Sequence, residues 1–349
     1  MTIYIIDLEP VESRYTAQWK KFIPQELSRL TNDKVITVSG GNVPQTTTPG
    51  AFLNFAGTNV YKSQQSIDVA KLFADNKVKA GDHFVYTDAW NPSIIQLQYM
   101  RQLLQVDCKI HALWHAGSYD PQDFLGRLIP DKKWSYSFET ALFHAIDHNY
   151  FATDFHIDMF TKNLYLRNEP GKIVRTGWPM GYMDSLLSNY KGMDKKEMIV
   201  FPHRLAPEKQ LDIFEDLANH LPEYEWVVCQ TKQLTKNEYY NILGESKIVF
   251  SANLQETLGI SCYEGALVDS IPMVPDRLSY SEMYMDEFKY PSEWTTDFNA
   301  YNQHKEKIIN KIKYFMENHS KLVPHVHKQA KSLQKNFFTA TNLYATINT

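Results

Sequence analysis

The sequence lacks the features that mark several common classes of protein. Its three cysteines, Cys108, Cys229 and Cys262, are widely spaced, so it has neither a disulfide framework nor a zinc-finger pattern. No apolar run approaches the ~20 residues of a membrane span. The first apolar run has no basic start and stops at Asp7, which argues against a signal peptide. We therefore expect a cytoplasmic protein with reduced thiols.

Several binding signatures are missing as well. No G-x-G-x-x-G follows the first predicted strand, which argues against a dehydrogenase, and the absence of G-x-x-x-x-G-K-[ST] argues against a P-loop kinase. The chain contains no D-x-D pair that could clamp a metal ion. The formal net charge is −4, and residues 1–178 carry equal numbers of basic and acidic residues. Neither half is therefore a basic nucleic-acid module.

Apolar runs alternate with helical patterns along all 349 residues, which is enough chain for two domains. This alternation predicts an α/β protein with two doubly wound, Rossmann-like domains. Strands are predicted at 4–6, 34–38, 83–86, 108–114, 147–153, 172–174, 197–201, 224–229, 247–250 and 271–274. Helices are predicted at 13–30 (capped by Ser13), 61–73, 94–104, 138–146, from 154, and at 210–220, 235–243, 279–283, 302–318 and 329–344.

The segment 251–275, SANLQETLGISCYEGALVDSIPMVP, contains the strongest functional pattern. It predicts a loop and a helix between two buried strands. Glu256 falls in the loop and Glu264 one to two turns into the helix, with seven residues between them. Gly259 allows close approach of the backbone to a ligand, and the free N–H groups of the first helical turn favour an anion. The alternative is an ordinary amphipathic helix with two surface glutamates.

This pattern resembles the E-x7-E signature of retaining glycosyltransferases with the GT-B fold. The matching parts are Ser251, ETLG at 256–259, EGA at 264–266 and DSIPMV at 269–274. Leu258 replaces an aromatic residue of the family pattern, and Asp269 replaces a common glycine. The resemblance implies two Rossmann-like domains that face each other across a cleft. Their expected limits are an acceptor-binding domain at 1–178, a nucleotide-sugar-binding domain at 179–328, and a terminal helix at 329–349 that crosses back to the first domain.

The resemblance also implies how the second domain would bind the donor. Glu256 would contact the sugar and Glu264 the ribose. Arg204 and Lys209, which have the family's spacing, would bind the diphosphate, where cations stabilise a departing anion. A salt-bridged helix start is the alternative for these two cations. The remaining expected donor contacts, including the site for the base, are Gln230, Thr257, Leu258 and Gly259. No metal and no cofactor are expected, and a UDP-sugar is the expected donor.

Polar residues also follow predicted strands in the first domain, at the edge where open α/β sheets bind ligands. His115 follows the strand at 108–114, and the resemblance places a histidine there against the donor sugar. Glu256, Arg204, Lys209 and His115 are the expected catalytic residues. Asp88, Trp90 and Asp120 are candidates for acceptor contacts. Asp120 and the nearby Asp123 can equally be helix caps or loop residues.

At finer grain the chain resembles glycosyltransferase-like proteins of T-even-type tailed phages and cyanophages. The matching segments are IDLEP at 6–10, TPGAFLN at 48–54, ALWHAGSYD at 112–120 and FPHR at 201–204. Some such enzymes glycosylate 5-hydroxymethylcytosine in double-stranded phage DNA, with glucose or arabinose. For such a substrate, the candidates for stacking on an extruded base are Trp90, Phe52 and Phe55, and those for a local basic surface are Lys20, Lys21, Lys132 and Lys133.

Three functions stay open at this point. The first is a retaining glycosyltransferase acting on modified phage DNA. The second is the same chemistry on a tRNA base, a glycan or a small molecule. The third is a catalytically inactive GT-B protein that only binds its ligand. The uncharged stretch at 35–61 contains a long loop that can be functional or disordered. The sequence does not indicate an oligomeric state.

Overall fold

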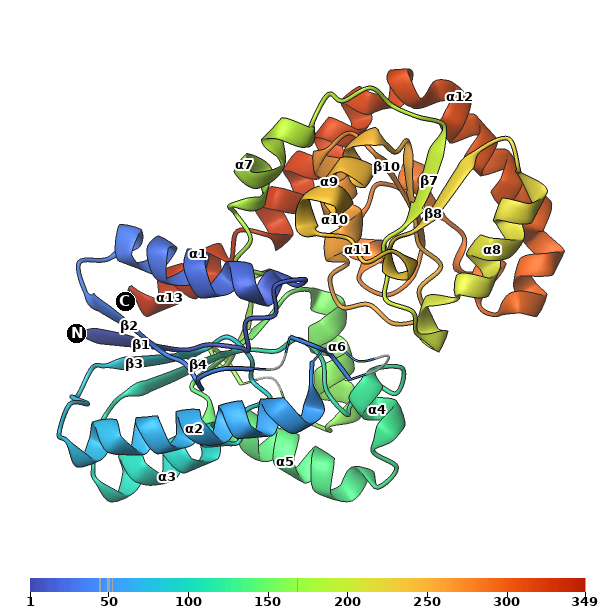
Figure 1. The fold of residues 1–349 in the computed structure, drawn as a ribbon. Helices are drawn as coiled ribbons and strands as arrows, with labels where there is room; N and C mark the ends of the chain where they lie inside the picture. The colour runs from blue at the N-terminus through green and yellow to red at the C-terminus, as the bar shows by residue number, and fades with distance from the viewer. Residues whose placement is uncertain (44, 49–50, 52, 168, 349) are drawn as a thin grey trace. The chain divides into compact units, whose positions relative to one another are not determined.

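Parallel strands form two separate sheets in the computed structural model, which describes residues 1–43, 45–48, 51, 53–167 and 169–348 (Figure 1). The chain divides into two units. The first consists of Met1–Pro179 and Ala340–Thr349, and the second of Met180–Thr339. Each unit is an α/β domain with its own sheet, so the α/β class is confirmed.

The sheet of the first unit has the order β2-β1-β3-β4-β5-β6, and all of its pairings are parallel. Its strands are β1 (Thr2–Ile6), β2 (Lys34–Val38), β3 (His83–Tyr86), β4 (Lys109–Leu113), β5 (His148–Phe151) and β6 (Ile173–Arg175). The direction in which strands are added reverses between β1 and β3. Ligands of doubly wound sheets bind outside the carboxyl ends of the strands at such a switch point.

The sheet of the second unit repeats this topology, with the order β8-β7-β9-β10-β11. Its strands are β7 (Met198–Phe201), β8 (Glu225–Val228), β9 (Ile248–Phe250), β10 (Ile271–Pro275) and β11 (Lys289–Tyr290). Here the switch point lies between β7 and β9. The loops after these two strands contain Arg204, Lys209 and Glu256, so three of the predicted donor residues lie at this switch point.

Helices cover both faces of the first sheet (Figure 1). They are α1 (Tyr15–Leu30), α2 (Phe55–Ala74), α3 (Ser93–Leu103), α4 (Phe124–Leu128), α5 (Lys132–Ala145), α6 (Asp154–Asn163) and α13 (Thr341–Ile347). Three predicted starts were wrong. Helix α5 begins six residues before position 138, because the Asp131 side chain accepts from the Lys133 N–H at 3.0 Å and caps it. The N-cap of α1 is Arg14, without a side-chain bond, and not Ser13. Helix α2 begins six residues before position 61, because the Asn54 side chain accepts from the Gly57 N–H at 2.8 Å and caps it.

The helices of the second unit are α7 (Met183–Leu187), α8 (Leu211–His220), α9 (Lys236–Glu245), α10 (Ile260–Leu267), α11 (Tyr280–Met283) and α12 (Phe298–Phe337). Helix α12 replaces the two predicted helices at 302–318 and 329–344. Its buried residues, from Tyr301 to Phe337, continue at helical spacing past Pro324. The chain therefore rejoins the first unit at Ala340, which has a left-handed φ of 49°, and not at residue 329.

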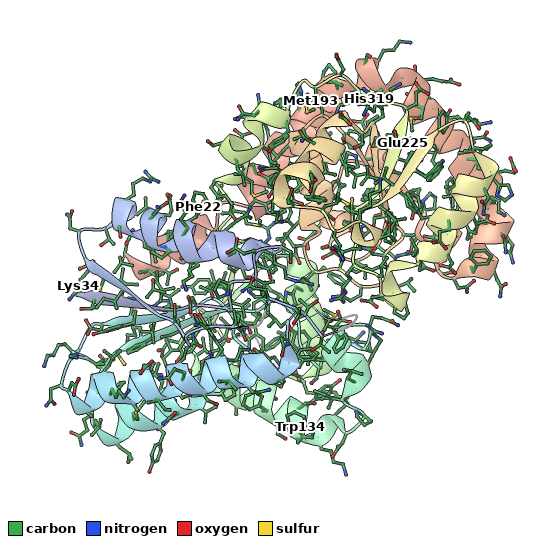
Figure 2. All side chains as sticks on the ribbon, in the orientation of Figure 1. Phe22, Lys34, Trp134, Met193, Glu225 and His319 are labelled. Atoms are coloured by element: carbon green, nitrogen blue, oxygen red, sulfur yellow. The ribbon has the colours of Figure 1, made fainter. Side chains whose placement is uncertain are left out.

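Buried side chains fill the space between each sheet and its helices (Figure 2). The core of the first unit includes Phe84, Ile110, Trp114, Phe143 and Phe160, all of which have an exposed fraction of 0%. All three cysteines are buried and free, as expected for reduced thiols. Over the described residues, no helix combines the length and the apolar character that crossing a membrane would require.

Candidate active site

The predicted strand, loop, helix and strand at 247–274 are confirmed as β9, a loop, α10 and β10. The loop turns into α10 at Gly259, whose φ of 78° lies in the left-handed region. A Cβ atom at this position would lie 2.6 Å from the Tyr280 ring. Both the conformation and the close contact therefore require glycine. Glu264 lies in the second turn of α10, as the sequence predicted.

Glu256 is held by the loop that contains it. Its Oε1 accepts from the backbone N–H groups of Thr257 at 3.2 Å and Leu258 at 3.3 Å, and its Oε2 lies 3.5 Å from the Lys209 ammonium. Burial favours the protonated carboxyl, but the Lys209 charge and the backbone donors outweigh it and lower the pKa of Glu256. The carboxylate is therefore anionic and can accept hydrogen bonds from hydroxyl groups.

Lys209 joins two loops of the second unit. It ends a short 3-10 helix at Pro207–Lys209 and is buried. Besides Glu256, its ammonium contacts the backbone oxygen of Gln255 and lies 3.3 Å from Gln255 Oε1. One cation thus fixes the loop after β7 to the loop after β9. Thr257 and Leu258 are buried within this second loop.

Arg204 forms the salt bridge that the sequence allowed as an alternative. Its Nη2 lies 2.5 Å and its Nε 3.2 Å from Oε1 of Glu208, one helical turn along the chain. The Glu208 side chain is only 1% exposed and that of Arg204 17%. The guanidinium is therefore oriented by a carboxylate, while part of its surface stays accessible.

Glu264 is paired with Tyr239, a residue that no sequence pattern singled out. The Tyr239 hydroxyl donates to Glu264 Oε2 at 2.7 Å. Burial raises the pKa of Glu264, and the Lys236 charge and the Tyr239 hydroxyl oppose this shift. Thr235 and Glu238 form a capping box at the start of α9, which sets the position of Tyr239 on that helix. Gln230, the predicted base contact, is exposed after β8.

His115 lies directly after β4 in the first unit, with both ring nitrogens engaged. Its Nε2 lies 2.7 Å from the Thr87 carbonyl oxygen, to which it must donate, and its Nδ1 lies 2.8 Å from the Tyr15 hydroxyl. The rings of Trp19 and Trp178 lie 5.3 and 4.4 Å from the imidazole. Burial lowers the pKa of His115, so this imidazole is neutral at pH 7.

Asp88 and Trp90 are brought together by Lys62, which no sequence pattern indicated. The Lys62 ammonium lies 2.9 Å from Asp88 Oδ2 and 2.6 Å from the Trp90 carbonyl oxygen. The Trp90 indole N–H donates to Glu139 at 2.8 Å. Burial favours the neutral Asp88 carboxyl, but the Lys62 charge dominates and lowers its pKa. Asp88 also lies close enough to His115 for the two to interact electrostatically.

Two aspartates shape the loop that follows His115. Asp120 is buried and accepts from the backbone N–H of Gln122 at 2.9 Å, and Asp123 caps α4 by accepting from Leu125 N–H at 3.0 Å. The cap that the sequence allowed as an alternative is thus present at Asp123. His111, which the sequence separated from His115, lies inside the sheet, with its ring nitrogens 2.9 Å from His83 and 2.8 Å from Tyr150.

The predicted stacking and basic residues lie at separate places in the first unit. Phe55 is half-buried against the Phe124 ring at 5.0 Å, whereas Phe52 lies outside the described residues. Lys20 and Lys21 are exposed on α1, and Lys132 and Lys133 start α5. Within the described ranges, no group of three or more His, Cys, Asp or Glu residues is arranged to hold a metal ion.

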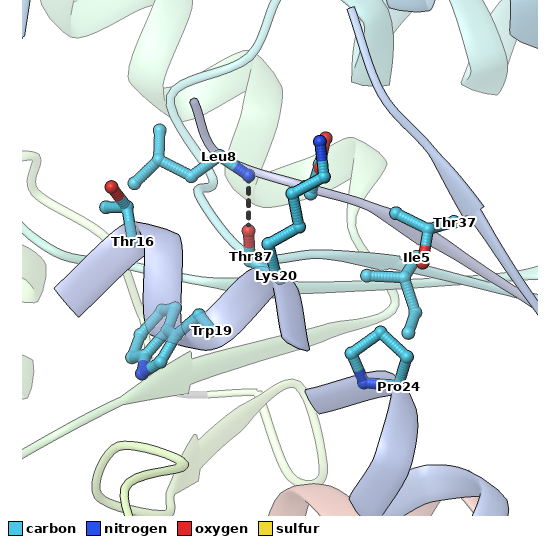
Figure 3. A pocket seen from close by; sticks show the side chains of 9 residues that line it. Ile5, Leu8, Thr16, Trp19, Lys20, Pro24, Thr37 and Thr87 are labelled. Atoms are coloured by element: carbon cyan, nitrogen blue, oxygen red, sulfur yellow. Dashed lines mark hydrogen bonds between the residues drawn. The ribbon is translucent and has the colours of Figure 1, made fainter. Parts of the chain in front are cut away.

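Figure 3 shows a small pocket beside the end of β1, lined by Ile5, Asp7, Leu8, Thr16, Trp19, Lys20, Pro24, Thr37 and Thr87. Two of its polar side chains already bind within the chain. Thr87 Oγ1 accepts from Leu8 N–H at 2.7 Å, and the Asp7 carboxylate accepts from Tyr61 at 2.5 Å and Ser39 at 2.6 Å. These bonds fix the backbone at the switch point between β1 and β3.

Comparison of the sequence with protein-family models finds no match, and comparison with curated proteins finds none either. Solved structures do match. Sucrose-phosphate synthase from Thermosynechococcus elongatus aligns over 99% of this chain and 98% of its own, with a TM-score of 0.65 and 10% identity. Anabaena HepE in complex with UDP aligns over 100% and 97%, with a TM-score of 0.60 and 10% identity.

A further match is the pneumococcal O-GlcNAc transferase GtfA in complex with UDP and GlcNAc, with a TM-score of 0.55 and 14% identity. It aligns over 82% of this chain, which spans only 60% of GtfA. At such identities the likeness concerns the fold alone. The two Rossmann-like domains, each with a parallel sheet, match the GT-B structures of glycosyltransferases, and the predicted fold is confirmed.

Proposed function

We propose that this protein is a retaining glycosyltransferase that uses a nucleotide-diphosphate sugar, with UDP as the preferred nucleotide. Glucose or arabinose is the proposed sugar, and 5-hydroxymethylcytosine in double-stranded phage DNA is the proposed acceptor. The observation that carries this proposal is the loop from β9 to α10. It combines an anionic Glu256, the buried Lys209 and the left-handed Gly259 at the switch point of the second unit.

In this proposal the second unit binds the donor. Backbone N–H groups around Gly259, together with Lys209, contact the diphosphate, because the start of a helix favours anions. Arg204 turns from Glu208 toward the phosphate, which competes for the same guanidinium through two parallel hydrogen bonds. Glu256 accepts hydrogen bonds from the sugar hydroxyls, and Glu264 from the ribose. Gln230 contacts the base.

The first unit contributes His115 and the acceptor contacts Asp88, Trp90 and Asp120. The bond between the anomeric carbon and the phosphate oxygen breaks, and its electron pair leaves with the diphosphate. The acceptor oxygen then bonds to the same face of that carbon. Its proton passes to the departing phosphate oxygen, which Arg204 and Lys209 stabilise. The neutral His115 contacts the sugar and stabilises positive charge through its backbone carbonyl or its ring, and no metal is required.

The test is to incubate the protein with a panel of nucleotide sugars and hydroxymethylcytosine DNA, then digest the DNA and weigh the nucleosides. We expect one donor to add the mass of a sugar residue to 5-hydroxymethyl-2′-deoxycytidine, with the anomeric configuration of the donor retained in the product by NMR. DNA with ordinary cytosine is the control. An inverted product would refute the mechanism. Transfer only to tRNA, a glycan or a small molecule would refute the acceptor, and nucleotide binding without turnover would indicate an inactive binding protein.

A further inference from the structure

Glu9 is a buried carboxyl group whose oxygens have no hydrogen-bond partner on any other residue that the structure describes. It lies three residues after the end of β1 and is 2% exposed. Neither carboxylate oxygen meets a donor from another residue within the part of the chain that the structure describes, although the Glu9 backbone N–H lies near enough to lower the carboxyl pKa slightly. Buried polar groups are nearly always hydrogen-bonded, and an unpaired one destabilises the fold, so such a group requires an explanation. The position of Glu9 supports one such explanation, which is that its carboxyl group binds a ligand.

Glu9 follows β1, and Asp88 follows β3, the two strands that flank the switch point of the first sheet. Ligands of doubly wound sheets bind outside this pair of carboxyl ends. Burial raises the pKa of Glu9 to about 7, while the Lys62 charge opposes the shift and Asp88 and Asp7 add to it. The Lys62–Asp88 ion pair also lies in electrostatic range of His115. Glu9 thus shares its neighbours with the residue proposed to contact the sugar.

The polar groups around Glu9 are committed to other partners. On α2, Tyr61 donates to Asp7 at 2.5 Å, Gln65 donates to the Asp7 carbonyl oxygen at 2.7 Å, and Lys62 is paired with Asp88. Thr58 lies one turn before Lys62 on the same face of α2. It is buried, and in the described residues its hydroxyl has no partner either. Among the described residues, Glu9 and Thr58 therefore lack hydrogen-bond partners from other residues beside side chains that have them.

We propose that Glu9 binds the acceptor substrate by accepting a hydrogen bond from the group beside the hydroxyl that receives the sugar. This inference rests on the proposed function. Two further carboxyl groups, those of Asp7 and Asp88, and the Lys62 ammonium lie in electrostatic range of Glu9. An anionic group such as a phosphate is therefore disfavoured, and an N–H or O–H donor is favoured. In hydroxymethylcytosine the 4-amino group lies beside the hydroxymethyl group. A carboxylate is a natural acceptor for that amino group.

The test compares two DNA duplexes that differ at one base pair, with 5-hydroxymethylcytosine opposite guanine in one and 5-hydroxymethyluracil opposite adenine in the other. Both offer the same hydroxyl, but uracil places a carbonyl oxygen where cytosine has the amino group. We expect the wild-type protein to prefer the cytosine substrate in kcat/KM by about tenfold to a hundredfold. In Glu9→Gln the amide can donate to the uracil carbonyl, so the preference should fall toward one. UDP affinity, measured by calorimetry, should stay unchanged.

Glu12→Gln is the matched control, because Glu12 is exposed on the same loop, and it should leave the preference unchanged. Glu9→Asp keeps the charge and should keep the preference at a lower kcat/KM. An unchanged preference in Glu9→Gln would refute the role of Glu9 and leave the proposed function intact. A lower Tm with equal losses on both duplexes would show a merely structural role. No transfer to either duplex would overturn the proposed acceptor and this inference together.

Discussion

The hydroxyl group of Tyr239 on α9 donates a 2.7 Å hydrogen bond to Glu264 on α10. Because Glu264 is buried, this bond fixes the orientation of a carboxylate that we assign to the ribose. Removing the hydroxyl in Tyr239→Phe should weaken UDP binding by about fivefold, the value of one hydrogen bond of ~1 kcal/mol. Calorimetry with UDP and 2′,3′-dideoxy-UDP checks this, since only UDP offers the ribose hydroxyls. Equal losses for both nucleotides would contradict it.

Arg204 and Lys209 should matter most in the transition state, when negative charge develops on the departing diphosphate. We expect Arg204→Ala and Lys209→Ala to lower kcat by about 100- to 1000-fold each. Arg204→Ala should also lower the free energy of unfolding by about 1–3 kcal/mol, because it removes a charged partner of the buried Glu208. Steady-state kinetics and urea unfolding measure the two effects. Lys191→Ala, an exposed lysine of the same unit, should change neither.

His115 should stay neutral throughout the reaction. Burial lowers its pKa, so the charge of the imidazole should not change between pH 7 and 9, and kcat should show no ionisation from His115 there. We expect His115→Ala to lower kcat by about 100-fold. Tyr15→Phe, which removes only the hydroxyl beside Nδ1, should lower it less. A His115→Ala variant with wild-type kcat would refute the catalytic assignment.

Gly259 should not tolerate a side chain. Its left-handed φ of 78° opposes alanine, and so does the Tyr280 ring, which would lie only 2.6 Å from an added methyl group. Gly259→Ala should therefore destabilise the protein by about 1–3 kcal/mol and weaken UDP binding, since the backbone N–H groups around Gly259 are proposed to contact the diphosphate. Gly181→Ala is the control, because nothing lies within 4 Å of its Cβ position. Urea unfolding measures the stability of the two variants, and calorimetry measures their UDP affinity. Equal values for Gly259→Ala and Gly181→Ala would contradict the prediction.

Glu9 should make the protein less stable as the pH rises. Its pKa increases from 4.5 in the unfolded chain to about 7 in the folded one. Between these values the folded state holds a proton that the unfolded state has lost, so stability falls with increasing pH. The total loss is roughly 3 kcal/mol, complete above pH 7. Glu9→Gln should abolish this part of the pH dependence. The free energy of unfolding of the variant, relative to that of the wild type, should therefore be higher at pH 8 than at pH 4.5.

Most of the fold could be predicted from local patterns. Strands β2 and β3 have the predicted limits, because each is a short apolar or alternating run between turn signals. The positions of Glu256 and Glu264 follow from their spacing to Gly259, which ends the loop and begins α10. Such features depend on neighbouring residues in the chain, and a sequence displays these directly.

The partners of the site residues required the tertiary structure. Tyr239 and Glu264 are separated by 25 positions, and Lys62 and Asp88 by 26. Each pair meets because two elements pack on the same sheet, and no local pattern specifies which side chains then come into contact. Two helices were predicted on either side of Pro324, but the structure has the single helix α12. The burial of side chains along its whole length outweighs the tendency of proline to end a helix. The unpaired state of Glu9 is likewise a property of packing, since burial removes water without supplying a partner.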